Sequence, residues 1–489
     1  MSENPPPLPL PRRRPHRWPL ILCLALFVFT AGIIPGFYLE EKIRGKLAWR
    51  AYERDAQKRG VKLTAADILP PTIPDSENFA SIPLFKAAFQ ASDADKPVPN
   101  PFDLFVTKNE ERPKLGNPIK QRTVDLAAWQ KFFVDAQRIP EASGDAAADV
   151  LSALDTFAEP LAQLRTAGDR PRCRFPVHWE KGFTTPFPHL GILQGASCLY
   201  SLRLSAHLAR GESAAAYADF SAGWREVTAT AAEPALIAAL VRNATAVQIE
   251  NAVWDGLARG QWAEPDLKRI EADLAGVDWL KDCLFAFGSE RALSNGMFDL
   301  LIDHPDEIGR VGDLKDPQEY KVFELYPAGW NYQSKVRFNR FIDEILARVD
   351  PAQGRCFLER PIRSSPKSLP EMPWKMYYLF FALVAPIFED AESKFAQIGT
   401  HTNHCRLACA LERFRLARGD HPDRLEDLVP KFLPSLPVEI VNGEPYHYHR
   451  LADGRFVLYS VGTDLKDDGG EIDPNAKKQK DWVWRYPAM

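Results

Sequence analysis

Five carboxylates and two glycines fall within residues 464–473 of this chain: Asp464, Asp467, Asp468, Gly469, Gly470, Glu471 and Asp473. Calcium takes six to eight oxygen ligands from flexible loops, and carboxylates that alternate with backbone carbonyls can supply them. The pattern therefore predicts a candidate calcium site formed by Asp464, Asp467 and Asp473. A solvated Asp/Gly turn explains the same composition without any metal. The spacing is not that of the twelve-residue EF-hand loop.

A second group of ligand-type residues lies in the sequence HTNHCRLAC, at His401, His404, Cys405 and Cys409. On a helix, residues 401, 405 and 409 share one face and 404 lies beside it, so two or three zinc ligands could converge. A single helix rarely supplies a whole site, however, and small buried cysteines are common in protein cores. We favour the core interpretation for these residues.

Three residues in predicted loops could act as acid–base groups: His178, Glu180 and His189. Nothing near them in the sequence resembles a nucleophile or an oxyanion hole. The Gly-x-Ser-x-Gly, phosphate-binding-loop, His-Glu-x-x-His and dinucleotide motifs are all absent from the sequence. We therefore predict no catalytic residue and no cofactor site other than the candidate calcium loop, and a non-enzymatic role is favoured.

The elements that position these groups begin with an apolar stretch at 19–38. No charge occurs from Leu20 to Phe37, and a helix of this length rises about 27 Å, close to the hydrocarbon thickness of a bilayer. Arginines precede the stretch and glutamates follow it: Arg12, Arg13, Arg14, Arg17, Glu40 and Glu41. This asymmetry predicts a single-pass inner-membrane protein with its N-terminus in the cytoplasm and its bulk outside. The alternative is a cleaved signal peptide.

Chain length, net charge and cysteine content limit the class of protein. A chain of 489 residues exceeds the size of one hydrophobic core, so at least two packed units are expected. The net charge of -4 provides no basic surface, which excludes nucleic acid as a partner. Seven cysteines are scattered through the chain and form no disulfide framework.

We expect a mainly α protein with an N-terminal transmembrane helix, an extracytoplasmic antiparallel array of helical hairpins and a small C-terminal β-sheet. The predicted segments are a disordered cytoplasmic tail (1–18), the transmembrane helix (19–38), a helical stalk (39–60), a loop-rich wrapping segment (61–190), an α-helical body (191–373), and a long helix plus β module (374–489). Within the wrapping segment, residues 82–91, 126–137 and 146–165 are helix candidates.

The strongest helical signal runs from Gly191 to Ile302, where apolar residues recur with helical spacing between short loops. The tetrapeptide Leu-Ala-Arg-Gly ends three predicted helices, at Gly211, Gly260 and Gly419. Arginine suits the negative end of the helix dipole, and glycine accepts the left-handed conformation that follows. Further on, residues 446–449 and 456–461 are predicted strands joined by a turn at 450–455.

The C-terminal part resembles that of the major pseudopilin of type II secretion systems. The likeness rests on a helix end followed by a Tyr-Ser-x-Gly-x-Asp string and a late Asp-Trp, at Arg413, Leu416, Gly419, Pro422, Leu425, Leu428, Tyr459, Ser460, Gly462, Asp464, Gly469, Gly470, Asp481 and Trp482. In that family the last loop holds calcium, which is what the resemblance implies here. Pseudopilins place a cleavable Gly-Phe and a glutamate before the apolar helix, whereas here Gly36, Phe37, Glu40 and Glu41 lie at its end. The chain should therefore not assemble as a pilin.

The whole chain also resembles uncharacterised membrane-anchored helical proteins of planctomycete and verrucomicrobial type, which carry a string like Pro74–Phe79 (PDSENF) near the start. That likeness implies no activity.

Three functions follow from the sequence. The favoured one is a non-enzymatic, membrane-anchored scaffold that contacts the lipid bilayer through 19–38 and binds another envelope protein. The alternatives are an accessory component of a secretion or pilus-like apparatus and an unrecognised envelope hydrolase.

Overall fold

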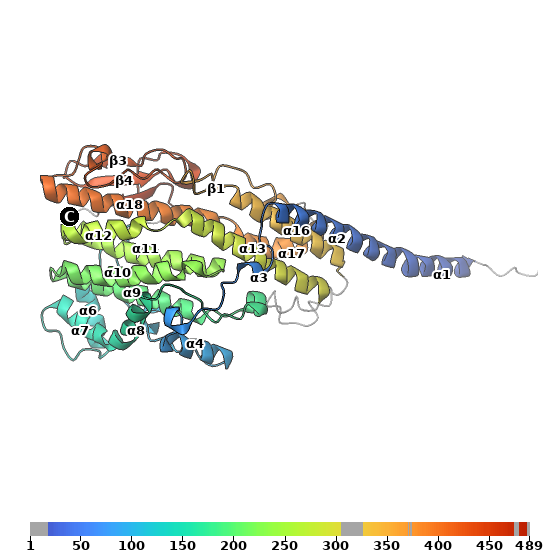
Figure 1. Ribbon diagram of the computed structural model, residues 1–489, viewed down its shortest axis with the longest axis horizontal. Helices are drawn as coiled ribbons and strands as arrows, with labels where there is room; N and C mark the ends of the chain where they lie inside the picture. Colours follow the sequence, from blue (N-terminus) through green and yellow to red (C-terminus); the bar gives the residue numbers. More distant parts are fainter. Residues whose placement is uncertain (1–17, 305–325, 370, 372–373, 474–478, 487–489) are drawn as a thin grey trace, which may run out of the picture.

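A computed structural model describes the chain except for residues 1–17, 305–325, 370, 372–373, 474–478 and 487–489. Figure 1 shows an elongated helical body from which one long helix projects. Short helices within residues 83–168 lie along one side of the body, and the C-terminal sheet covers the other. The tail predicted for 1–18 lies, apart from Trp18, outside the described residues.

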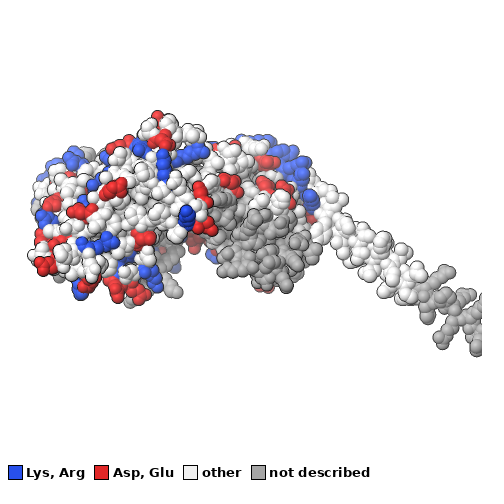
Figure 2. Space-filling view, turned by 90° about the horizontal axis from the view of Figure 1, so that it is seen from below, with Lys and Arg blue, Asp and Glu red and all other residues white. Residues whose placement is uncertain are grey.

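The projecting helix is continuous from Trp18 to Lys58. It consists of α1 (Trp18–Val28), a π-helical turn η1 (Phe29–Ile33) and α2 (Ile34–Lys58). No residue of α1 is buried. Among the described residues this is the one helix long and apolar enough to cross a membrane. Figure 2 shows its outer part without charged side chains, whereas Lys, Arg, Asp and Glu are interspersed over the body on this face.

The second half of the projecting helix packs against α16 (Ala328–Leu346). The two backbones meet at glycines: a Cβ on Gly45 would lie 2.4 Å from the carbonyl oxygen of Gly329, and a Cβ on Gly329 would lie 2.1 Å from that of Glu41. Polar contacts reinforce the crossing. The carboxylate of Asp343 accepts hydrogen bonds from the Tyr52 hydroxyl (2.9 Å), Arg59 (3.0 Å) and Arg291 (2.7 Å). Burial raises the pKa of Tyr52 to about 12, so this hydroxyl keeps its proton and donates.

Short elements fill the segment between the stalk and the body: α3 (Ala65–Ile68), η2 (Asp75–Glu77), α4 (Pro83–Asp93), α5 (Asp103–Val106), α6 (Leu126–Asp135), α7 (Ala146–Leu154), η3 (Asp155–Phe157), α8 (Ala158–Gly168) and η4 (Trp179–Thr184). The three helix candidates of this segment are thus confirmed, with the last divided by η3. Its aromatic side chains enter the same hydrophobic core as the body helices, so this segment forms no separate core.

The PDSENF string has a structural role at this junction. Asn78 donates to the carbonyl of Arg174 (2.9 Å) and accepts from the backbone N–H of Arg174 (2.8 Å). The N–H of Phe79 donates to the carbonyl of Arg172 (2.7 Å), and the Phe79 ring is fully buried. The string therefore fastens two distant loops to each other and to the core.

The body is built from α9 (Pro188–Ala209), α10 (Ser213–Ala229), η5 (Thr230–Ala232), α11 (Leu236–Ala258), α12 (Glu264–Ala275) and α13 (Trp279–Asp303). No strand occurs between 193 and 257, all of which the structure describes, and the predicted array of antiparallel helices is confirmed. Gly211, Gly260 and Gly419 have φ angles of 75°, 62° and 94°, so all three Leu-Ala-Arg-Gly strings end helices as predicted.

A second core lies where α13 and α16 meet the C-terminal half of the chain. This core contains α13, α16, the short strands β1 (Val349–Asp350) and β2 (Arg355–Cys356), and α17 (Leu379–Val384). Three short helical turns lie around α17: η7 (Pro366–Ser368) and η8 (Trp374–Tyr378) precede it, and η9 (Ala385–Phe388) follows it. The long α18 (Ala391–Arg418) contributes Phe395 to this core and Leu407 to the first one. It therefore connects the two cores along its length.

The C-terminal sheet follows η10 (Leu425–Leu428) and consists of β3 (His447–Arg450), β4 (Phe456–Ser460) and β5 (Trp482–Arg485), all antiparallel, with η11 (Gly462–Asp464) between the last two. The predicted hairpin is confirmed, with Gly454 in the left-handed conformation at its turn. In the register, Leu458 pairs with Trp484. Both side chains are buried, which places the sheet against the body.

The glycine contact gives a prediction about stability. Gly329→Ala would force α2 and α16 apart, because the new methyl group overlaps a backbone carbonyl, and overpacking of this kind costs about 1–3 kcal/mol. We expect urea denaturation of the full chain in detergent micelles to show this loss. The matched control is Gly296→Ala, at an exposed position inside α13 where a Cβ meets no atom within 4 Å. It should be neutral or stabilising, and an equal loss in both variants would contradict the assignment.

Candidate functional site

The acidic loop after β4 is organised by a buried aspartate. Asp481, fully buried, accepts hydrogen bonds from the backbone N–H groups of Asp468 (3.1 Å) and Gly470 (2.8 Å). Burial raises the pKa of this carboxyl. The sequence resemblance included Asp481. The spacing alone could not reveal that this residue, eleven positions beyond Gly470, closes the loop from inside.

The residues predicted as calcium ligands have separate partners. Asp467 accepts from the Tyr459 hydroxyl (3.0 Å) and the Gly469 N–H (2.9 Å), whereas Asp464 accepts from the Lys466 N–H (3.3 Å). The backbone N–H of Asp473 donates to Gln479 (3.2 Å). Over the described ranges, no group of three or more His, Cys, Asp or Glu side chains lies in a metal-binding arrangement. The calcium site stays a prediction, without a ligand cluster to support it.

The HTNHC residues belong to α18, which packs against α11. His401 and Thr402 both hydrogen-bond to the buried carboxylate of Glu250, and Trp279 donates to Thr402 (2.9 Å). His404 packs edge-on against Tyr446, and burial lowers its pKa well below the usual value, so it is neutral. Cys405 and Cys409 are fully buried. These residues pack the core, as favoured from the sequence.

The loop histidines are divided between two environments. His178 is partly exposed and lies between Asp93 (3.1 Å) and Glu180 (2.9 Å), whose carboxylates raise its pKa. His189 is fully buried, pairs with Glu233 (3.0 Å) and stacks on Phe175 with ring centroids 3.7 Å apart. A substrate cannot reach a ring enclosed in this way, so the two histidines do not form one site.

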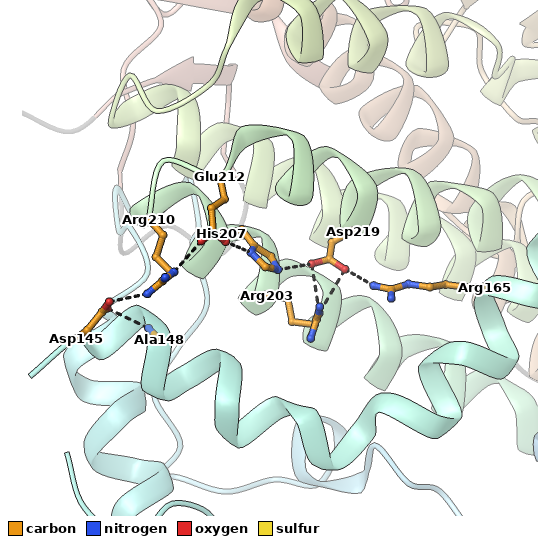
Figure 3. A network of polar contacts seen from close by, with 8 residues as sticks. All are labelled: Asp145, Ala148, Arg165, Arg203, His207, Arg210, Glu212 and Asp219. Atoms are coloured by element: carbon orange, nitrogen blue, oxygen red, sulfur yellow. Dashed lines mark hydrogen bonds and ion pairs between the residues drawn. The ribbon is translucent and has the colours of Figure 1, made fainter. Parts of the chain in front are cut away.

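A longer polar network connects the helices on one side of the body (Figure 3). Asp219 of α10 is buried and accepts from Arg165 (2.6 Å) and Arg203 (3.3 Å), with His207 at 3.6 Å. His207 also contacts Glu212 (2.7 Å). Arg210 then joins Glu212 to Asp145, whose other oxygen caps α7 at the Ala148 N–H. Each carboxylate has at least one cationic partner, and the network holds α7, α8, α9 and α10 in register.

One buried carboxyl lacks such partners. Glu226 is 2% exposed and forms no ion pair among the described residues; the Tyr200 hydroxyl lies beside it. Burial raises its pKa to about 8. It borders a cavity of about 10 Å³ shared with Glu233 and Thr245, which has room for about one water molecule. Nothing in the sequence distinguishes this residue, because it occupies one turn of an ordinary amphipathic helix.

A larger cavity of about 350 Å³ lies between η4, the start of α11, α13 and η9. Its lining is mostly apolar, with a single carboxylate, that of Glu290. Glu290 accepts a hydrogen bond from the backbone N–H of Leu236 (3.1 Å), the first residue of α11, and burial raises the pKa of this carboxyl. The cavity is a candidate binding site. Nothing in the sequence indicates it, because its walls come from four separate segments.

Comparisons with protein-family models, with curated proteins and with solved structures found no match.

The buried aspartate gives a prediction that also tests the calcium loop. Asp481→Ala leaves two backbone N–H groups without an acceptor and should lower the stability of the C-terminal sheet by about 1–3 kcal/mol. Protease sensitivity after β4 should increase.

Asp464→Ala removes one long hydrogen bond and should have little effect without calcium. If added calcium raises the melting temperature of the wild-type chain but not of Asp464→Ala, the loop binds the ion.

The buried Glu226 carboxyl predicts a pH dependence. Glu226 keeps its proton up to about pH 8 in the folded protein, but loses it near 4.5 when unfolded. The folded state therefore binds more protons between these values, so the free energy of unfolding falls as the pH rises through this window. At pH 8, Glu226→Gln should be more stable than wild type by roughly a few kcal/mol. The exposed Glu159→Gln should keep the wild-type slope; a Glu226→Gln slope equal to wild type would refute the assignment.

Proposed function

We propose that the chain is a single-pass membrane protein of the inner membrane whose helical body acts outside the cytoplasm as a non-enzymatic scaffold for another envelope protein. One observation carries the proposal. The long apolar helix does not end in a flexible linker but continues as α2 and packs backbone to backbone on α16. An anchor joined rigidly to a body is suited to holding that body in a fixed position at a bilayer.

Aromatic residues at the neck support a bilayer boundary there. Phe37, at the end of the apolar stretch, lies edge-on to Trp330, with ring centroids 6.2 Å apart. Trp330 also contacts Tyr326 (5.3 Å) and Tyr377 (5.6 Å). Tryptophan and tyrosine are enriched where membrane spans meet water. The cluster therefore lies at the level where a bilayer-spanning helix would emerge.

The two alternatives have less support. The hydrolase would need His178 or His189 beside an accessible acid and a nucleophile. His189 is enclosed by aromatic rings, and His178 pairs with two carboxylates but contacts no nucleophile among the described residues. The secretion-apparatus component rests on the C-terminal resemblance alone. A scaffold requires no active site and does not depend on the C-terminal resemblance. Helix packing accounts for the buried polar networks of the body.

Alkaline phosphatase fused after Arg59 tests the topology, because this enzyme folds only outside the cytoplasm. We expect an active fusion in cells. The same fusion lacking 20–37 should be inactive and is the matched control. The fusion tests the orientation directly. Three basic residues of α2, Lys42, Arg44 and Lys46, follow the span closely, and basic residues beside a span favour the cytoplasmic side. An inactive fusion after Arg59 would overturn the extracytoplasmic placement.

The same cells test the scaffold. Cross-linking of intact cells should shift the full chain into a discrete complex larger than its own 55.1 kDa. A chain with the span but without 191–489 should remain uncomplexed. If the full chain also stays at its monomer size across cross-linker concentrations, it has no stable envelope partner and the scaffold proposal fails.

A further inference from the structure

The 350 Å³ cavity has the composition of a small-molecule site. Its walls are large apolar side chains from separate elements: Trp179, Phe187, Leu240, Leu293, Met297 and Phe388. Pockets of 300–1,000 Å³ with apolar walls and few polar groups are typical of ligand sites. At about 30 Å³ for each water-sized unit, the space accommodates roughly a dozen non-hydrogen atoms.

The only titratable side chain in the described lining is Glu290. One of its oxygens, Oε2, accepts the Leu236 N–H at the start of α11. The other, Oε1, has no hydrogen-bond partner among the described residues and is not sealed from the cavity. A buried acceptor without a hydrogen bond is unfavourable in apolar surroundings. A hydrogen-bond donor on a ligand would satisfy the free oxygen.

The mouth of the cavity is open to exchange. Ile387 and Ile237, which border it, are 70% and 49% exposed. Ile387 lies in the short η9, and Ile237 lies in the first turn of α11. In Figure 1, α13 and α17 lie in the half of the body from which the projecting helix leaves. An apolar ligand can therefore enter without any rearrangement of the long helices.

We propose that this cavity binds a small apolar molecule bearing one protonated amine, with the ammonium group on the Glu290 carboxylate. A charge-assisted hydrogen bond between an ammonium and a carboxylate is stronger than a neutral one, and more so in a low-dielectric pocket. This inference stands independently of the scaffold function, because it depends only on the walls of the cavity and its carboxylate.

Charge complementarity distinguishes the amine from other occupants. No Lys, Arg or His side chain lines the described part of the cavity, so in that part an anionic head group would meet only the carboxylate and be repelled. A neutral hydrocarbon would fill the apolar space but leave Oε1 unpartnered. An alcohol could donate to Oε1, though without the ionic component. The expected order of affinity is therefore amine, then alcohol, then carboxylate.

Three probes of nearly equal size test this order: 1-naphthylmethylamine, 1-naphthylmethanol and 1-naphthoate. Each is titrated into the full chain in lipid nanodiscs by calorimetry, with empty nanodiscs subtracted. The amine should bind saturably, at least about tenfold more tightly than the alcohol, and naphthoate should not bind. Amine and alcohol affinities within twofold of each other, or no saturable binding of the amine, would overturn the proposal.

Variants separate a ligand contact from a helix cap. Glu290→Gln keeps an oxygen for the Leu236 N–H but loses the charge, so amine affinity should fall about tenfold while alcohol affinity stays. The exposed Glu426→Gln should leave both affinities unchanged. Ile237→Trp, which fills the mouth, should weaken both probes. If Glu290→Gln binds the amine as wild type does while remaining folded by circular dichroism, Glu290 serves only to cap α11 and the amine site does not exist.

Discussion

The crossing of α2 and α16 is the contact on which the rest of the architecture depends. Two glycines allow the backbones to touch, and any larger side chain at either position would meet a carbonyl of the other helix. Around this contact, Lys335 lies over the Trp49 ring (3.9 Å) and pairs with Asp299 (2.6 Å). Burial lowers the pKa of Lys335, but its ion pair keeps the charge partnered. Close backbone packing and enclosed charges together fix the angle between the projecting helix and the body.

A second set of constraints fixes the register of the body. Arg406 and Arg413 of α18 pair with Glu271 (3.0 Å) and Glu264 (2.9 Å) of α12, in antiparallel order. Ion pairs of this kind contribute little net stability. Shifting α18 by one turn would nevertheless leave partly buried charges without partners, which is costly. The pairs therefore select one alignment of helices whose apolar faces alone would tolerate several.

Local signals in the sequence predicted local structure well. The Leu-Ala-Arg-Gly strings located three helix ends because glycine at a left-handed position is a property of a few adjacent residues. The β3–β4 hairpin followed from the β-rich residues on either side of Asp453-Gly454, a pair that favours a tight reversal. The candidate sites depend on contacts between distant segments instead. Glu226 and Glu290 look like any helix glutamate in the sequence, and their surroundings come from other helices. The acidic loop was conspicuous by composition, yet the residue that organises it, Asp481, lies outside the acidic run.

The continuous helix has a mechanical consequence. From Trp18 to Lys58 it contains 41 residues, which span about 60 Å when helical. If its first half is held by a bilayer, a sideways force on the body acts on the helix as a torque, because no hinge at the neck can absorb it. Tilting of the body and tilting of the span then become one motion. Membrane thickness, which sets the tilt of a spanning helix, would in turn set the angle at which the far end of the body, about β3 and α12, is presented.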